Sequence, residues 1–271
     1  MAGAIVTFLS DYGLDYELVG VCHGVIARRC PQARVIDIAH SIAPQDVLQG
    51  ALVLRDALPY MPAGVHLAIV DPTVGRAERR AVAVRCAEEA RLLVGPDNGL
   101  LSLAAERLGG AVEAVDVGRS GERLTPVSAT FHGRDVFAPV AAALACGREL
   151  ADVGEAIAAA SLTTVTLPSA RVEAGALVTH VLRRDRFGNL ALDASFAQLA
   201  AVGIGAGGSF TLRAGEAVVS GRRMSTFADV AAGELVLYED SSRLAALAVN
   251  RGSAAAALGA EPGARLVLQV R

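Results

Sequence analysis

The sequence predicts an α/β N-terminal domain with a mostly parallel sheet, followed by a C-terminal antiparallel β-barrel domain. Through the first part of the chain, short apolar runs alternate with stretches of helical periodicity, a pattern typical of a parallel sheet covered by helices. After about residue 168 the pattern changes to short β-type runs separated by turn residues, as in a small antiparallel barrel. We therefore expect domains at residues 1–168 and 169–271.

The first domain begins with repeated strand and helix units. Residues 4–9 are apolar and β-prone, and the apolar positions over 16–29 recur at helical spacing. A second strand is expected at 34–38, and a second helix at 44–58, where Pro44 lies near the start and is tolerated. Further strands are expected at 65–70, 81–85, 91–94 and 113–117, and further helices at 100–108 and 136–145.

The second domain is expected to contain mainly strands. They are predicted at residues 176–182, 208–213, 216–219, 234–238, 244–249 and 264–270, with brief helices at 196–200 and 253–258.

Composition favours a compact protein that acts on a small molecule. Hydrophobic residues make up 53% of the chain and charged residues 20%, which excludes a disordered chain. The formal net charge of −3 provides no basic field for nucleic acid or an anionic membrane. The sequence has neither a long apolar segment nor a secretory leader pattern, so we expect a cytoplasmic protein without membrane spans.

The four cysteines are scattered along the chain. Cys22, Cys30, Cys86 and Cys146 form no C-x-x-C pair and have no histidine at zinc-finger spacing. We therefore expect buried thiols, no disulfide and no metal site.

Asp71 is the first candidate for chemistry. It follows the apolar run 65–70, and the region after it carries Arg76, Arg79 and Arg80. Ligands of open α/β sheets bind beyond the carboxyl ends of the strands, where Asp71 would lie. Taken alone, the Asp-Pro pair is explained better as the start of a turn. The other polar clusters likewise have ordinary explanations as helix caps, turns or buried histidines.

The order of these clusters along the chain favours a functional interpretation over the ordinary structural ones. The chain carries S-D-Y-G at 10–13, V-D-P-T-V-G at 70–75, D-N-G-L-L at 97–101, F-H-G-R-D at 131–135, D-R-F-G-N at 185–189 and N-R-G-S at 250–253. This series resembles the S-adenosylmethionine hydroxide adenosyltransferases, relatives of the fluorinating and chlorinating enzymes. The resemblance implies a Rossmann-like α/β domain, a β-barrel domain, and a homotrimer with its sites between subunits. It also implies that no cofactor is used, because S-adenosylmethionine is the substrate.

The reaction implied by the resemblance is attack of water or hydroxide on the ribose C5′, which yields adenosine and methionine. The catalytic residues it implies are Asp71, Arg79 and His132. The segment after Gly75 is one residue longer than the family pattern, so the pattern allows more than one arginine in this role. Arg76 and Arg80 remain alternatives, as does the identity of the group that accepts the proton.

The same resemblance implies a substrate-binding set. Asp11 would accept the two ribose hydroxyls, Asn189 would face the adenine edge, and Gln45 stands where the halogenating relatives carry a large aromatic residue. Phenylalanines would enclose the base, and polar side chains would hold the methionine ammonium. The remaining members of the set are Tyr12, Thr73, Phe131, Gly133, Asp185, Phe187, Phe227, Ser241, Val249 and Asn250.

Two alternatives stay open. The chain could be a halogenase of the same class, although those relatives lack the aspartate and histidine found here at 71 and 132. It could also be a module that binds S-adenosylmethionine or adenosine without catalysis, against which the intact set of Asp71, Arg79 and His132 argues.

Overall fold

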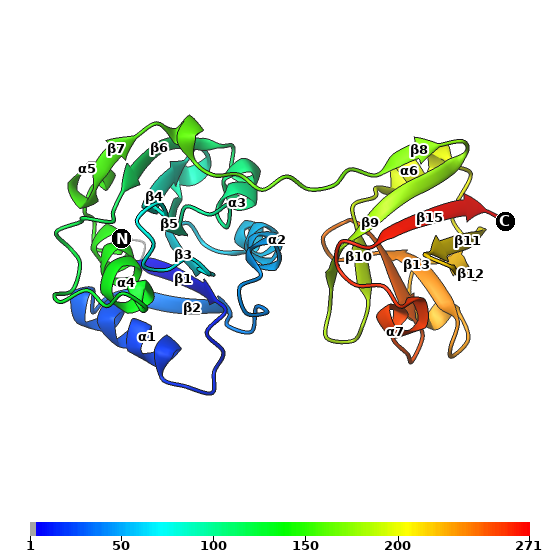
Figure 1. The fold of residues 1–271 in the computed structure, drawn as a ribbon, viewed down its shortest axis with the longest axis horizontal. Coiled ribbons are helices and arrows are strands. Elements are labelled where there is room, and N and C mark those ends of the chain that lie inside the picture. Colours follow the sequence, from blue (N-terminus) through cyan, green and yellow to red (C-terminus); the bar gives the residue numbers. More distant parts are fainter. Residues whose placement is uncertain (1–3) are drawn as a thin grey trace. The chain divides into compact units, whose positions relative to one another are not determined.

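The computed structural model describes residues 4–271. The chain forms two compact units, Met1–Val165 and Thr166–Arg271, each with its own hydrophobic core (Figure 1). The division falls at Val165, close to residue 168, where the sequence pattern changes.

A seven-stranded sheet with the order β2-β1-β3-β5-β4-β6-β7 forms the centre of the first unit. Parallel pairing joins β2 to β1, β1 to β3 and β3 to β5, whereas β4, β6 and β7 each pair antiparallel with the preceding strand in that order. Because β6 runs opposite to β4, it shares the direction of the parallel strands, and the predicted mostly parallel sheet is confirmed. The strands are β1 (Ile5–Ser10), β2 (Arg34–Ala39), β3 (Val65–Ile69), β4 (Ala81–Cys86), β5 (Leu92–Pro96), β6 (Ala111–Asp116) and β7 (Glu155–Ile157).

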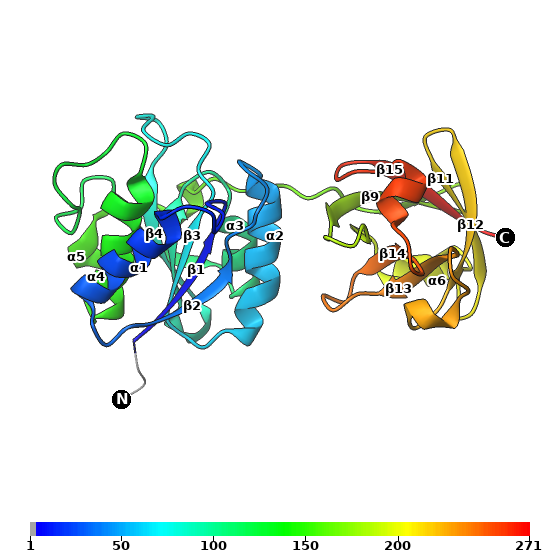
Figure 2. The ribbon, with the colours of Figure 1, turned by 90° about the horizontal axis from the view of Figure 1, so that it is seen from below.

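Helices cover both faces of this sheet (Figure 2). Along β1, Phe8 packs in the cluster that contains Ile26 of α1, while Leu9 packs in the cluster that contains Leu54 of α2. Adjacent strand residues thus face opposite layers, as the period of two requires. The helices are α1 (Leu18–Arg29), α4 (Ala138–Ala145) and α5 (Leu150–Val153) on one face, and α2 (Val47–Ala57) and α3 (Ser102–Arg107) on the other.

Some helix boundaries differ from the predicted ones, and several short helical turns lie between the main elements. The helix α2 starts at Val47 rather than at 44, because the Asp46 side chain caps it by accepting from the Gln49 backbone N–H over 2.8 Å. A π-helical turn, η3 (Gly133–Phe137), precedes α4, and the 3₁₀ turns are η1 (Leu58–Tyr60), η2 (Glu88–Ala90) and η4 (Ala159–Ser161). Within residues 4–271, no helix is long and apolar enough to cross a bilayer.

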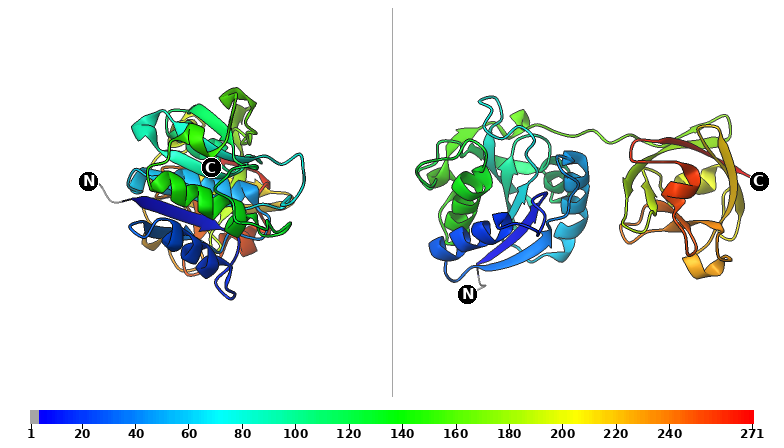
Figure 3. Two further views of the ribbon diagram at one scale, coloured as in Figure 1. Left: turned by 90° about the vertical axis from the view of Figure 1, so that its left-hand side faces the viewer. Right: turned by 60° about the horizontal axis from the view of Figure 1, so that its bottom comes forward.

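The second unit is a β-barrel closed by the pairing of β9 with β10 (Figure 3). The barrel order is β10-β14-β13-β12-β11-β15-β9, and β8 (Arg171–Glu173) pairs with β9 at the outside. The barrel strands are β9 (Ala176–Arg184), β10 (Leu190–Leu192), β11 (Ser209–Ala214), β12 (Ala217–Arg223), β13 (Leu235–Glu239), β14 (Ala245–Val249) and β15 (Arg265–Val270). Two short helices, α6 (Phe196–Ala201) and α7 (Ala254–Leu258), complete the unit.

The predicted barrel is confirmed, but its pairing is mixed rather than purely antiparallel. The strands β12 and β13 pair in parallel, from Gly221 with Leu235 to Arg223 with Leu237. A parallel pair needs a crossover longer than a hairpin turn. Residues 224–234, which include the 3₁₀ turn η5 (Phe227–Asp229), supply that crossover.

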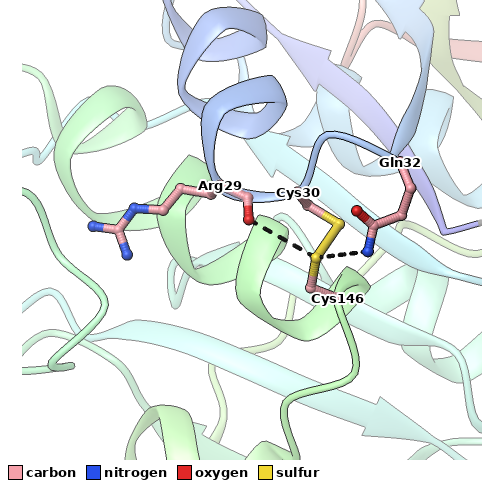
Figure 4. Close-up of a disulfide and its surroundings, with 4 residues drawn as sticks. All are labelled: Arg29, Cys30, Gln32 and Cys146. Atoms are coloured by element: carbon pink, nitrogen blue, oxygen red, sulfur yellow. Dashed lines mark hydrogen bonds between the residues drawn. A yellow bond between two sulfur atoms is a disulfide. The ribbon is translucent and has the colours of Figure 1, made fainter.

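The cysteines differ from the prediction in one respect. Cys22 and Cys86 are buried thiols, as expected, but Cys30 and Cys146 form a disulfide, with their Cα atoms 5.7 Å apart (Figure 4). The prediction of no disulfide is therefore wrong for this pair. The two residues are 116 positions apart in the sequence, and only the packing of α1 against α4 brings them together.

Candidate active site

The carboxyl edge of the parallel strands gathers most of the predicted residues of the first unit. Asp11 follows β1, and Asp71 follows β3. The neighbouring strands hold the chain beside Asp71: the Asp11 backbone N–H donates to the Ile69 carbonyl over 3.3 Å, and the Asn98 side chain donates to the Val70 carbonyl over 2.8 Å. Because β4 runs in the opposite direction, its start brings Arg79 to the same edge.

Asp71, Arg79 and His132 form one contact cluster. Nη2 of Arg79 lies 2.9 Å from Oδ2 of Asp71 and 2.7 Å from Nδ1 of His132. The side chains of Arg79 and Asp71 are only 4% and 6% exposed, so this ion pair is shielded from solvent. The Arg79 guanidinium also lies over the Phe137 ring, 5.4 Å from its centroid.

The other two arginines point elsewhere. Arg80 donates from Nε to Asp97 over 2.8 Å and from Nη1 to the Ser161 hydroxyl over 3.0 Å. Arg76 is exposed, with no ion pair to Asp71 among the described contacts. Of the three candidate arginines, Arg79 is the one whose described contacts include both Asp71 and His132.

Burial changes the protonation of the whole cluster. It raises the pKa of Asp71, against the opposing effect of the Arg79 charge. Burial lowers the pKa of Arg79, with Asp71 acting in the other direction. The pKa of His132 is lowered by burial first and by the Arg79 charge second, so this imidazole is neutral at neutral pH.

The hydrogen bond from Arg79 also decides which tautomer His132 adopts. A guanidinium can only donate, so Nδ1 of His132 must be the acceptor, and the proton of the neutral ring is on Nε2. Oδ2 of Asp71 and Nε of Arg79 are buried and have no hydrogen-bond partner of acceptable geometry among the described residues. Such atoms are unusual in a folded protein and are suited to a bound polar group.

Two aromatic residues, Tyr12 and Phe131, pack beside the chain at His132 and Gly133. The Tyr12 and Phe131 rings meet edge to face with their centroids 5.7 Å apart. An added Cβ at Gly133 would overlap the Tyr12 hydroxyl, so only glycine allows this packing. Burial raises the pKa of Tyr12, which therefore remains a neutral phenol. Gly133 opens the π-helical turn η3, a feature often found at functional sites.

Asp11 and Thr73 border the same edge. Oδ2 of Asp11 accepts from the Gln45 backbone N–H over 3.0 Å, and Gln45 adopts a positive φ of 68°. The Thr73 hydroxyl lies 3.5 Å from Oδ1 of Asp71, at the outer limit of a hydrogen bond.

A cavity borders the cluster on the side of Arg79 and His132. Arg79 and His132 line it together with Arg76, Arg119 and Arg123, and its volume is about 470 Å³. A cavity of this size admits water and small polar molecules.

The predicted residues of the second unit lie in segments that contact one another. Asp185 closes the β9–β10 turn by accepting from the Phe187 backbone N–H over 2.8 Å and from the Asn189 side chain over 2.7 Å. This turn packs on the start of α7, where the Ala255 N–H donates to the Gly188 carbonyl over 2.9 Å. Phe187 is 68% exposed.

The remaining predicted residues of the second unit lie near α7, the turn η5 and the ends of β13 and β14. Asn250, which precedes α7, donates to the Val230 carbonyl over 2.7 Å, beside the turn η5 that carries Phe227. The Phe227 ring meets Tyr238 edge to face at 4.7 Å. Ser241 is exposed in the loop after β13, and Val249 is half-buried at the end of β14.

Sequence reasoning missed two features of the first unit. Asn98 lies in the D-N-G-L-L motif, but only the structure shows that it supports the backbone before Asp71. His23, Asp37 and His40 also converge, with their potential ligand atoms all within 4.8 Å of one another. The D-I-A-H segment that ends β2 contains two of these residues, but no spacing pattern points to the third, on α1.

The fold and this site define a two-domain protein with a buried Asp-Arg-His cluster at the carboxyl edge of an α/β sheet. Models of the SAM hydroxide adenosyltransferase N-terminal and C-terminal domains match residues 6–154 and 179–267. The chain belongs to the SAM hydroxide adenosyltransferase family.

Named relatives agree with this membership. A protein named (R)-S-adenosyl-L-methionine hydrolase from Salinispora tropica is 48% identical over 96% of each chain. One of the same name from Thermus thermophilus is 40% identical, covering 95% of this chain and 96% of that one. A protein named fluorinase from an Actinoplanes species is 29% identical over 91% of each chain.

Solved structures agree as well. An uncharacterized conserved protein from Thermotoga maritima has a TM-score of 0.89 at 32% identity, over 97% of this chain and 99% of that one. A conserved hypothetical protein from Thermus thermophilus has a TM-score of 0.77 at 38% identity, over 97% and 98% of the two chains.

Proposed function

We propose that this protein is an enzyme that hydrolyses S-adenosyl-L-methionine to adenosine and L-methionine. The observation that carries the proposal is the buried contact of Arg79 with both Asp71 and His132. The hydrolase name of relatives at 40% and 48% identity supports it.

The chemistry needs little beyond a placed and activated water molecule. The sulfonium departs from C5′ as a neutral thioether, so its leaving group requires no general acid. The oxygen of water forms a bond to C5′, the C5′–S bond breaks, and its electron pair remains on sulfur. The enzyme must hold water in line with that bond and accept its proton.

We assign the proton to Asp71. His132 already accepts a hydrogen bond at Nδ1 and carries its own proton on Nε2, so the neutral ring has no free acceptor. Oδ2 of Asp71 has no hydrogen-bond partner of acceptable geometry, and its raised pKa makes it a better base than an ordinary aspartate. Arg79 stabilises the hydroxide character that the oxygen gains as its proton moves to Asp71, and His132 orients that oxygen through Nε2–H.

The substrate-binding roles remain part of the proposal. Asp11 binds the ribose diol. The other substrate-binding residues of the first unit are Tyr12, Thr73, Phe131 and Gly133. The barrel residues Asp185, Phe187, Asn189, Phe227, Ser241, Val249 and Asn250 bind adenine and methionine. The exposed Phe187 ring and the mutual packing of these barrel segments support a binding surface there.

We also propose a homotrimer whose sites lie between neighbouring subunits. Its support is the resemblance to the family across both units. Native mass spectrometry of the full chain tests it, and a monomer that retains full activity would rule it out.

The proposed compartment is the cytoplasm. The Cys30–Cys146 pair offers the test of this proposal, because disulfides are rare in reducing compartments. Alkylation of thiols in intact cells, followed by mass spectrometry, would show whether this pair is reduced there.

The decisive experiment is product analysis in oxygen-18 water, with the two sulfonium epimers of S-adenosylmethionine supplied separately. The relatives' name specifies the (R) form, so we expect faster turnover of that epimer. Label in the adenosine 5′-hydroxyl establishes the nucleophile. Binding without any product would support the non-catalytic alternative, and a 5′-halo-adenosine that depends on chloride or fluoride would support the halogenase alternative.

A further inference from the structure

The side chains of His23, Asp37 and His40 come together at one place in the first unit. His23 lies on α1, Asp37 on β2, and His40 directly after β2. Oδ1 of Asp37 is 2.8 Å from Nε2 of His23 and 3.0 Å from Nε2 of His40. We propose that these side chains bind one divalent transition-metal ion of the Zn²⁺ class. The ion would hold the loop Ser10–Gly13 in place and take no part in the reaction.

The three donors match the coordination chemistry of zinc. Two imidazole nitrogens and one carboxylate form a known three-ligand zinc set, with a fourth position left for water. Tetrahedral zinc with ligands at about 2.0–2.2 Å places the ligand atoms roughly 3.3 Å apart. The observed separations of 2.8 and 3.0 Å therefore need to widen by only a few tenths of an ångström.

His40 provides the second, independent observation. Its side chain is only 3% exposed, and Nε2 makes no hydrogen bond of acceptable geometry with any described residue, despite its proximity to Asp37. A buried imidazole nitrogen without such a bond is unfavourable. A metal ion between His40 and Asp37 would satisfy that nitrogen.

The environment of His40 orients its ring toward this position. Nδ1 lies 2.7 Å from the Ser10 hydroxyl, and the ring meets Phe8 edge to face at 4.6 Å. Histidines that bind metals usually have their other ring nitrogen fixed by such a partner. Asp37 and His23 have side chains 43% and 34% exposed, so an ion can enter from solvent.

The same histidine is bonded to the loop that carries Asp11. Besides the Ser10 contact, the His40 carbonyl accepts from the Gly13 N–H over 2.7 Å. The Tyr12 N–H in turn donates to the Ser10 hydroxyl over 3.3 Å. An ion bound to His40 would therefore restrain both ends of the segment Ser10–Gly13.

The test is calorimetric titration of ZnCl₂ into tag-free, EDTA-treated full-length protein at neutral pH. We expect one Zn²⁺ per chain at this site and a visible absorption band when Co²⁺ replaces it. His23→Gln and Asp37→Asn change side chains that are 34% and 43% exposed, so both variants should fold, and each should raise the Kd at least tenfold.

The matched control is His180→Gln. His180 also faces a carboxylate, with Nδ1 3.0 Å from Asp193, but it has no second histidine nearby among the described clusters. This variant should retain the wild-type Kd. Absence of zinc binding to the wild type, or an unchanged Kd in both cluster variants, would overturn the metal site.

Hydrogen exchange tests the link to the loop. Zinc should slow exchange of the Tyr12 and Gly13 amides in the wild type but not in Asp37→Asn. Zinc binding with unchanged exchange at these amides would show that the ion does not restrain the loop.

Discussion

Nη2 of Arg79 donates to Nδ1 of His132 across 2.7 Å, and this single bond connects the loop before β4 to the π-helical turn before α4. It places a positive charge beside the imidazole and determines the tautomer. Burial first and this charge second lower the pKa of His132.

Replacing Arg79 with lysine should therefore impair the chemical step. A lysine ammonium is a point charge without the planar fork of donors, and it cannot be expected to reach Asp71 and His132 together. We expect kcat to fall by about 10²–10³-fold, the usual loss on removing one charge-stabilising donor. Steady-state assay of adenosine release measures this, with the exposed Arg76→Lys as the control. A larger loss in the control would shift the role to Arg76.

Asp71→Asn should remove the proton acceptor while preserving the shape of the side chain. General-base catalysis typically contributes about 10²–10⁴-fold, and we expect a loss of kcat in that range. Binding of S-adenosylmethionine, measured by calorimetry, should change far less. The exposed Asp15→Asn is the control and should behave as the wild type. Normal turnover by Asp71→Asn would exclude this residue as the base.

The pH dependence of kcat should show a limb on the acid side. Asp71 must be ionised to accept a proton, and because its pKa is raised, activity should fall as the pH drops through a value above the ordinary aspartate pKa of about 3.9. Protonation of His132 also lowers activity, since a charged ring cannot accept a hydrogen bond from Arg79. Because the pKa of His132 is lowered, this loss of activity occurs only below a pH of about 6.5. A pH–rate profile measures the limb, and an activity that rises toward acid would contradict the assignment.

Gly133→Ala should disturb the packing beneath His132. The new methyl group would overlap the Tyr12 hydroxyl, and forced overpacking of this kind typically costs about 1–3 kcal/mol. Urea denaturation measures the change in the free energy of unfolding. The control is Gly20→Ala on α1, where an added Cβ meets nothing within 4 Å. Equal stability of the two variants would show that Tyr12 can move aside.

Cys146→Ser should destabilise the first unit without affecting chemistry. The Cys30–Cys146 bridge closes a loop with a sequence separation of 116, and disulfides of native proteins typically contribute about 2–4 kcal/mol. We expect a loss of that order in denaturation without reductant and an unchanged kcat. Reductant should lower the stability of the wild type to that of the variant. If reductant leaves the wild type unaffected, the bridge does not form in solution.

Local sequence was sufficient for most of the fold. The alternation of apolar runs with helical periodicity predicted the parallel strands and their helices, because burial on two faces leaves a pattern along the chain itself. Asp11 and Asp71 could likewise be placed, since a strand that ends in a carboxylate delivers it to the sheet edge. The family motifs then identified the candidate site.

Tertiary structure decided what depends on residues far apart in the sequence. It placed Arg79, rather than Arg76 or Arg80, in contact with Asp71 and His132, and it paired Cys30 with Cys146. It also paired β12 with β13 in parallel and brought His23 to Asp37 and His40. None of these leaves a periodic signal, because the direction of a side chain and the partner of a strand are set by packing between distant segments rather than by local composition.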